Sequence, residues 1–308
     1  MYQHYSPEEL AQQYSPSSCI SDIKVYIDAY ITKSHQAKKL AKKEKRVLTD
    51  LLYSENKEAK IDLYLPDTNS NTPQLTKKQL HLYIHGGYWQ ELSKEESSFA
   101  ATTFQKQGCY FAVINYPLAP NATLSEIVEQ NRLAIVWLYQ HAQQYGFDKN
   151  EIYLSGSSAG AHLAMMMLMT SWSPYFQDKA PVTNIMPIKG ICAVSGIYDL
   201  TPIAHTYIND LLQLTPDEII QNSPLLTPLA LLNNTTHPCH IIICYGSNET
   251  DEFKRQSQAM KDKLITLGYQ VTYKEISERN HFNVILDLAD NNSWLYAQVI
   301  KQMNNTTL

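Results

Sequence analysis

The sequence lacks cysteine pairs at metal-binding spacing and long apolar runs, and both absences narrow the class of protein. The five cysteines are odd in number and scattered, and no Cys-x-x-Cys pair or Cys/His spacing suggests zinc, so we expect no metal site. No apolar run approaches the ~20 residues that span a bilayer. The segment MYQHYSPEEL has no apolar signal-peptide core. The simplest interpretation is a reducing, cytoplasmic location without a membrane partner.

The chain also lacks an excess of basic residues. Its 25 Lys and Arg against 30 Asp and Glu give a net charge of −5, so no electrostatic footprint for nucleic acid is present. Hydrophobic content of 44% and charged content of 18% are ordinary for a globular protein. We find no repeat and no domain boundary. We therefore expect one domain over 1–308. We also expect a small-molecule substrate and no cofactor, and the sequence does not decide whether the protein forms a homodimer.

Predicted strands and helices alternate along most of the chain. The apolar patterns predict strands at 61–65, 80–84, 109–115, 151–155, 188–194, 240–245 and 270–276. Helices are predicted at 1–45, as a peripheral extension, and at 95–105, from 124, at 161–169, 251–267 and 293–303. Residues 67–78 are predicted to be a surface loop, and 199–236 a cap over a pocket. This alternation indicates an α/β fold, a mostly parallel sheet of about eight strands with helices on both faces.

The rest of the chain is organised around the motif GSSAG at residues 156–160. It follows an apolar strand and opens an apolar helix, which is the context of a nucleophile elbow. With only 10 glycines in the chain, two glycines flanking some serine would arise by chance about 2% of the time. Ser158 is therefore the candidate nucleophile, presented at a helix N-terminus where N–H groups favour negative charge.

A serine nucleophile needs a base and an orienting carboxylate, which follow it in the order acid, then histidine. His281 is the only histidine after position 240 and follows the last predicted strand, so it is the candidate base. Glu249, just past the strand 240–245, is the preferred acid. Asp251 and Asp199 remain alternatives, because both also follow predicted strands.

The third requirement is an oxyanion hole of backbone N–H groups. The motif HGGYW at residues 85–89 directly follows an early strand, and Gly87, Tyr88 and Ala159 are the expected donors, with Gly86 shaping the turn. Trp89 beside this loop either lines a substrate pocket or belongs to the core. His162 lies one helical turn past the serine, and a hydrogen-bonded core position is the preferred interpretation.

Four segments together resemble the kynurenine formamidase (arylformamidase) branch of the α/β-hydrolases: HGGYW at 85–89, GSSAGAHL at 156–163, SGIYDL at 195–200 and ETDEFKRQS at 249–257. The resemblance covers roughly residues 45–300. It implies Ser158 as nucleophile, Glu249 at the family's acid position, His281 as base and a structural role for Asp199. Two positions depart from the family pattern. Ser157 stands where histidine is usual, at the expected pocket floor, and Glu249 stands where animal members carry aspartate.

Three functional hypotheses follow. The first is a serine hydrolase that cleaves an aryl formamide such as N-formylkynurenine through an acyl-enzyme, in tryptophan catabolism. The second keeps this chemistry but acts on small carboxylic esters. The third is a binding protein on a hydrolase scaffold, which predicts a broken triad. Arg255 and Arg279 are the cations considered for a substrate carboxylate, without further support.

Overall fold

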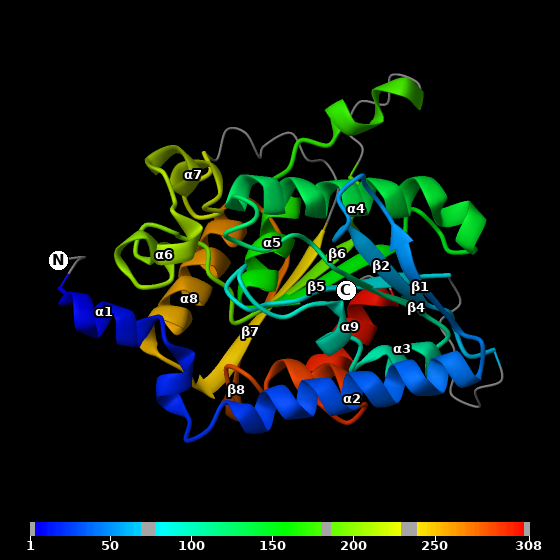
Figure 1. Ribbon diagram of the computed structural model, residues 1–308, viewed down its shortest axis with the longest axis horizontal. Coiled ribbons are helices and arrows are strands. Elements are labelled where there is room, and N and C mark those ends of the chain that lie inside the picture. The colour runs from blue at the N-terminus through cyan, green and yellow to red at the C-terminus, as the bar shows by residue number, and fades with distance from the viewer. Residues whose placement is uncertain (1–3, 69–77, 180–185, 229–238, 305–308) are drawn as a thin grey trace.

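The computed structural model describes residues 4–68, 78–179, 186–228 and 239–304 (Figure 1). Eight strands of this part form one sheet in the order β1-β2-β4-β3-β5-β6-β7-β8. β2 runs antiparallel to both of its neighbours, and all other pairs are parallel. The strands are β1 (Val47–Leu52), β2 (Lys60–Tyr64), β3 (Leu80–Ile84), β4 (Tyr110–Ile114), β5 (Ile152–Ser157), β6 (Gly190–Val194), β7 (His240–Asn248) and β8 (Val271–Asn280).

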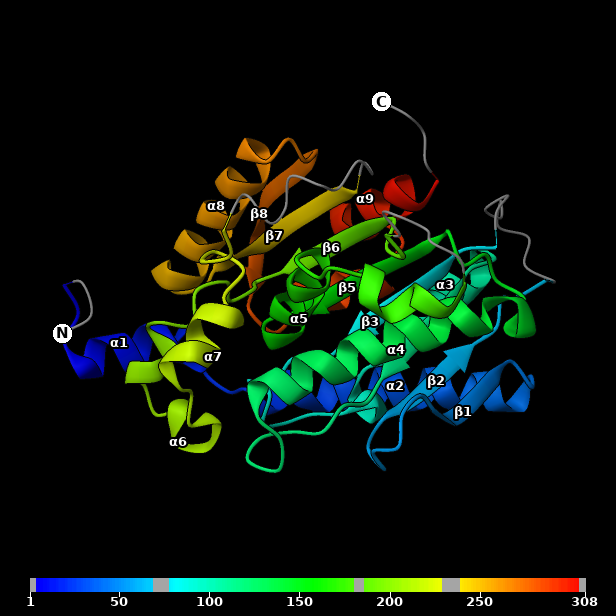
Figure 2. The same cartoon turned by 90° about the horizontal axis from the view of Figure 1, so that it is seen from above.

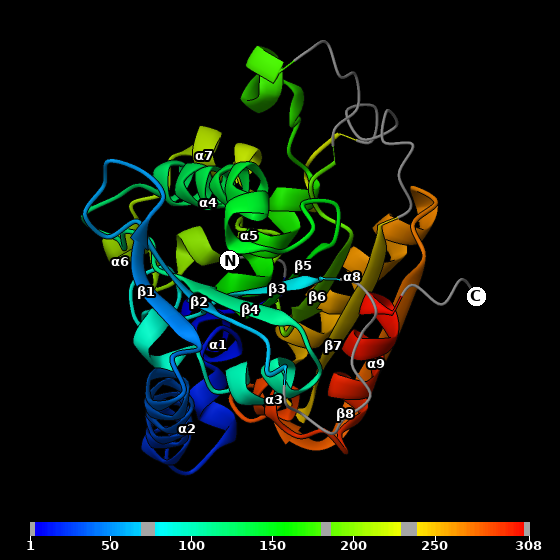
Figure 3. The same ribbon diagram turned by 90° about the vertical axis from the view of Figure 1, so that its right-hand side faces the viewer.

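The central strands are buried on both faces because their residues alternate between two apolar cores. In β3, Leu82 and Ile84 belong to one core and Tyr83 to the other. The first core is covered by α4 (Leu124–Tyr145), α5 (Ala159–Leu168) and α8 (Asp251–Thr266), and the second by α2 (Lys24–Lys43), α3 (Ala101–Lys106) and α9 (Trp294–Met303) (Figure 3). The predicted α/β architecture with helices on both faces is confirmed.

Two local expectations differ from the structure. The helix predicted at 95–105 is broken into the 3₁₀ turn η2 (Lys94–Glu96) and the short α3. The buried hydroxyls of Ser97 and Ser98 donate to the carbonyls of Ser93 and Ser34 rather than facing solvent. Serines bonded to backbone carbonyls in this way compete with helix formation. The half-buried edge strand β1 was not predicted, because it begins just after a strongly basic helix end.

Three short helices, α1 (Pro7–Gln13), α6 (Asn209–Leu212) and α7 (Pro216–Gln221), lie near the end of β7 (Figure 2). The other short elements are η1 (Pro16–Cys19), η3 (Ser173–Lys179), η4 (Ile203–His205) and η6 (Ile285–Ala289). The expected cap at 199–236 thus contains three short helical pieces between residues 203 and 221. Residues 229–236 lie outside the described residues, as does most of the loop expected at 67–78. In the described part of the chain, no helix is long and apolar enough to cross a membrane.

Candidate active site

The GSSAG motif forms a sharp turn between β5 and α5. Ser158 adopts φ 57° and ψ −120°, a strained conformation for a residue with a side chain. Its neighbours must be small. A Cβ on Gly156 would lie 2.2 Å from the carbonyl oxygen of Gly160, and a Cβ on Gly160 would lie 2.1 Å from that of Ile84. The two glycines therefore let strand and helix pass close together, which places Ser158 at the N-terminus of α5.

Glu249 and His281 are brought together by the register of the last two strands. Asn248 at the end of β7 pairs with Asn280 at the end of β8, so the residues that follow each strand are neighbours. The Nδ1 atom of His281 lies 2.8 Å from Oε2 of Glu249, and both side chains are almost fully buried. With Nδ1–H donating to the carboxylate, the other ring nitrogen of His281 is free to accept a proton.

The Glu249 carboxylate is held by two further donors. Its Oε1 atom accepts hydrogen bonds of 2.6 Å from the Gly246 N–H and of 2.6 Å from the Ser195 hydroxyl. A buried carboxylate that accepts several hydrogen bonds keeps a fixed orientation. Ser195 was not expected at the site. The SGIYDL motif, which contains Ser195, was the feature of the sequence that could have indicated this contact.

The two other carboxylates considered from the sequence lie elsewhere. Asp199 accepts a hydrogen bond from the Thr201 N–H through Oδ1, and its own backbone groups bond to Gln256. Asp251 is the first residue of α8 and is exposed. Of the three candidates, Glu249 is the one bonded to His281.

The HGGYW loop turns sharply beside Ser158. Gly87 has φ 92°, and a Cβ there would lie 2.2 Å from the Glu91 carbonyl oxygen. Gly86 has room for no side chain either, since its Cβ would lie 2.8 Å from the carbonyl oxygen of Ser157. In the described part of the chain, the N–H groups of Gly87, Tyr88 and Ala159 donate to no protein acceptor. These groups are therefore available to a ligand.

Trp89 is a core residue, so the expectation that it lines the pocket is wrong. Its side chain is fully buried, and its Nε1–H donates to Nδ1 of His162 over 3.2 Å. The Nε2–H of His162 in turn donates to the Asn222 carbonyl over 2.6 Å. Burial lowers the pKa of His162 to about 4, so the ring is neutral, consistent with accepting at one nitrogen and donating at the other. His162 is thus the core histidine expected from the sequence.

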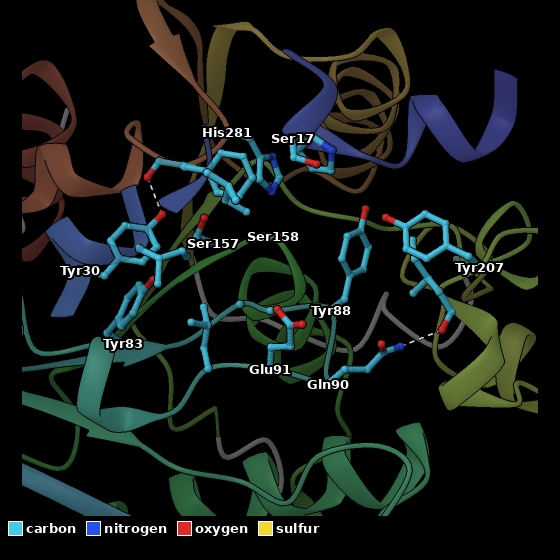
Figure 4. Close-up of a pocket in the computed structure, with 18 residues that line it drawn as sticks. Ser17, Tyr30, Tyr83, Tyr88, Gln90, Glu91, Ser157, Ser158, Tyr207 and His281 are labelled. Carbon is cyan, nitrogen blue, oxygen red and sulfur yellow. Dashed lines mark hydrogen bonds between the residues drawn. The ribbon is translucent and has the colours of Figure 1, made fainter. Parts of the chain in front are cut away.

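A cavity opens above Ser158, and both Ser158 and His281 line it (Figure 4). Figure 4 shows Tyr30, Tyr83 and Ser157 on one side of the nucleophile and Tyr88, Tyr207 and Ser17 on the other. The remaining lining residues are Pro16, Ile23, Ile27, Gly86, Gly87, Gln90, Glu91, Leu92, Ile208 and Phe282. The expected floor position of Ser157 is matched by its place in this lining. The cap segment contributes Tyr207 and Ile208.

The N-terminal segment was expected to be peripheral, and this expectation is wrong. Residues of η1 and α2 form one wall of the cavity. The segment is fixed to two loops of the site. The Tyr88 hydroxyl donates to the Tyr14 carbonyl over 2.5 Å, and Asn248 Nδ2 donates to the Cys19 carbonyl over 2.8 Å. The segment therefore bridges the HGGYW loop and the loop that carries Glu249.

We expect Tyr14→Phe to lower the free energy of unfolding by about 1–3 kcal/mol. The fully buried Tyr14 hydroxyl donates to Glu252 Oε2 over 2.7 Å and accepts from Gln256 Nε2 over 2.7 Å, so its removal leaves two buried polar groups short of a partner. Urea unfolding measures the loss. Tyr207→Phe is the matched control, because the Tyr207 side chain is 55% exposed and its hydroxyl contacts only Ser15 at 3.0 Å. Equal losses in the two variants would contradict the prediction.

Known proteins match this chain over the segments that build the site. The BD-FAE family model matches residues 61–264. A kynurenine formamidase from Danio rerio is 35% identical over 307 residues, covering 98% of each chain. One from Salmo salar is 36% identical and covers 97% of each chain. The chain belongs to the kynurenine formamidase family.

Members of the kynurenine formamidase family are hydrolases, and this protein is a hydrolase of the formamidase/esterase type. Solved structures agree on the fold. A Silicibacter sp. TM1040 protein described as a candidate thioesterase has a TM-score of 0.76 at 26% identity, covering 94% of this chain and 98% of that one. A Pyrobaculum calidifontis esterase has a TM-score of 0.66 at 17% identity, covering 97% and 96%, a likeness of fold alone. The α/β-hydrolase fold expected from the sequence is confirmed.

Proposed function

We propose that the protein hydrolyses aryl formamides of the N-formylkynurenine type with Ser158, His281 and Glu249 as its catalytic triad. The observation that supports this most is the hydrogen bond of 2.8 Å between His281 and the buried Glu249, at a cavity that His281 shares with Ser158. The family relatives named kynurenine formamidase support the substrate class.

In this mechanism His281 acts first as a base and then as an acid. It takes the proton from Ser158 Oγ, and the oxygen attacks the formyl carbon. The N–H groups of Gly87, Tyr88 and Ala159 stabilise the oxyanion that forms. His281 then donates its proton to the arylamine nitrogen as the C–N bond breaks, which leaves a formyl ester on Ser158. Water, deprotonated by His281, attacks this ester and releases formate, and Ser158 regains its proton.

Glu249 holds His281 in the tautomer that this sequence of steps requires. Its carboxylate accepts from Nδ1–H, so Nε2 is the nitrogen that exchanges protons. The charge of the carboxylate also stabilises the imidazolium form between the two proton transfers. The hydrogen bonds from Gly246 and Ser195 keep the carboxylate in place.

The second candidate is a small-ester carboxylesterase, favoured by Ser157 at the cavity where the family pattern has histidine. The deciding measurement is kcat/KM for N-formylkynurenine beside p-nitrophenyl acetate. We expect kcat/KM for the formamide to exceed that for the ester by at least about tenfold. This ratio corresponds to about 1.4 kcal/mol of additional transition-state stabilisation. Ester cleavage with little formamide turnover would replace the first candidate by the second. Failure of both substrates, with no labelling of Ser158 by a fluorophosphonate, would favour a binding protein.

A further inference from the structure

The cavity above Ser158 carries negative charge without a matching cation. Among the described residues that line it, Glu91 has a carboxylate and none is lysine or arginine. The two arginines considered from the sequence are paired outside the cavity. Arg255 binds Glu252 through contacts of 2.9 and 2.8 Å, and Arg279 binds Asp287 through contacts of 2.9 and 3.1 Å. A substrate carboxylate therefore meets no cationic side chain on this wall.

Glu91 is held next to the proposed oxyanion loop by its backbone. Its N–H donates to the Gly87 carbonyl over 2.9 Å, and the left-handed conformations of Gly87 and Tyr88 set the course of the chain between them. Figure 4 shows the Glu91 carboxylate among the cavity side chains, below Ser158 and beside Tyr88 in this view. The Glu91 side chain makes no hydrogen bond or ion pair within the described part of the chain. The carboxylate is therefore available to a ligand.

The surroundings of Glu91 also suit a cation. Tyr88 and Tyr207 line the same side of the cavity, and aromatic faces attract ammonium groups. Neighbouring Gln90 donates through Nε2 to the Ile208 carbonyl over 2.7 Å, which fixes its amide and leaves its oxygen as an acceptor. The described side chains on this side of the cavity therefore offer acceptors and aromatic rings and no cation for an anionic substrate group.

We propose that Glu91 is the counter-ion for an ammonium group on the substrate and makes the enzyme select aryl formamides by charge. The proposal rests on the proposed function, since it names the part of an aryl formamide that lies away from the scissile bond. An amine-bearing formamide without a carboxylate is the preferred class. An amino-acid formamide pairs its α-ammonium with Glu91, while its carboxylate stays toward solvent. A formamide whose only charge is a carboxylate is the poorest substrate.

The test uses four 2-acylformanilides with the same ring and formamide. Their acyl chains end in an ammonium group, an ammonium with a carboxylate, a methyl group or a carboxylate. We expect kcat/KM to fall in that order, with the cation preferred over the anion by about tenfold, because a partly exposed ion pair contributes little more. The preference should shrink as salt rises from 0.05 to about 1 M, since screening weakens exposed pairs.

Two variants identify Glu91 as the cause. Glu91→Gln should reduce the cation-to-anion ratio to about one- to threefold, and Glu91→Lys should invert it. Each variant is compared with its own rate on the neutral substrate, so a general loss from a disturbed loop cancels in the ratio. An unchanged ratio in both variants, or equal kcat/KM for all four substrates in the wild type, would overturn the proposal.

Matched phenyl acetates with the same four chains separate this proposal from the proposed function. If the wild type cleaves the esters through Ser158 but turns over no formamide, the formamidase function fails and the ester series still measures charge selection by Glu91. If formamides are cleaved but the order of substrates does not depend on residue 91, the formamidase function stands and the role of Glu91 is rejected.

Discussion

Replacing Ser158 with alanine is expected to lower kcat for both formamide and ester hydrolysis by about 10⁴- to 10⁶-fold, the range found for removing a serine nucleophile. The variant retains the cavity and the N–H groups of Gly87, Tyr88 and Ala159, so a small residual rate over water should survive. Steady-state kinetics with both substrates measures the loss, with fluorophosphonate labelling of separate samples to show that wild type reacts and the variant does not. A loss below about tenfold would exclude Ser158 as the nucleophile.

The three residues of the proposed triad should act as one unit in catalysis. In the wild type, one carboxylate oxygen of Glu249 accepts from His281 and the other accepts from Gly246 and Ser195. Glu249→Gln replaces one of these oxygens with an NH₂ group, so this donor must face another donor. If the amide N–H faces His281, the ring takes the wrong tautomer, and a loss of about 10⁴-fold in kcat follows. Combined with Ser158→Ala, this variant should have a kcat close to that of Ser158→Ala alone. Ser171→Ala, at an exposed serine outside the cavity lining, is the control expected to keep wild-type activity.

Gly160→Ala is expected to lower the free energy of unfolding by about 3–5 kcal/mol, or to prevent folding. An added Cβ would lie 2.1 Å from the Ile84 carbonyl oxygen and 2.7 Å from that of His85. Both are backbone atoms and cannot rotate away, so α5 would have to move off β3. The ~1 kcal/mol by which alanine favours a helix over glycine cannot offset this clash. Urea unfolding and soluble yield measure the effect.

Gly268→Ala separates steric clash from backbone strain. A Cβ at Gly268 meets no atom within 4 Å, but the residue has φ 83°, so its substitution costs only the left-handed penalty of about 1–2 kcal/mol. Gly160 has the opposite combination, with close atoms and no positive φ. If the two substitutions cost the same, the close approach of α5 to β3 is not what requires glycine at position 160.

The sequence alone was sufficient for the alternation of most strands and helices and for the sharp turn that carries Ser158. Strands buried on both faces need apolar residues at successive positions. The apolar runs of β5 and β7 meet this need within a few neighbouring residues, so they can be recognised in the sequence. The tight passage of β5 into α5 needs glycine at two fixed positions around Ser158, so the turn is also encoded by near neighbours. Properties that depend on residues close in the chain can be predicted from the pattern.

Only the tertiary structure decided which carboxylate contacts His281. Glu249, Asp251 and Asp199 all follow strands, so the sequence favoured Glu249 by its position but left the other two open. The pairing of Asn248 with Asn280 brings the ends of β7 and β8 together and selects Glu249. The outcome depends on the register between two strands and on a hydrogen bond from Ser195, which lies 54 positions away in the chain.

The cavity wall likewise could not be predicted from the pattern. The sequence left Trp89 open between a pocket and the core and placed the N-terminal segment at the periphery, whereas Trp89 is buried and the segment lines the cavity. Alternating patterns report that a side chain is buried but not which segment covers it. The wall joins residues near 16–30, 83–92, 157–158, 207–208 and 281–282, and contacts between segments so far apart arise only when the sheet, the cap and the N-terminal segment pack together.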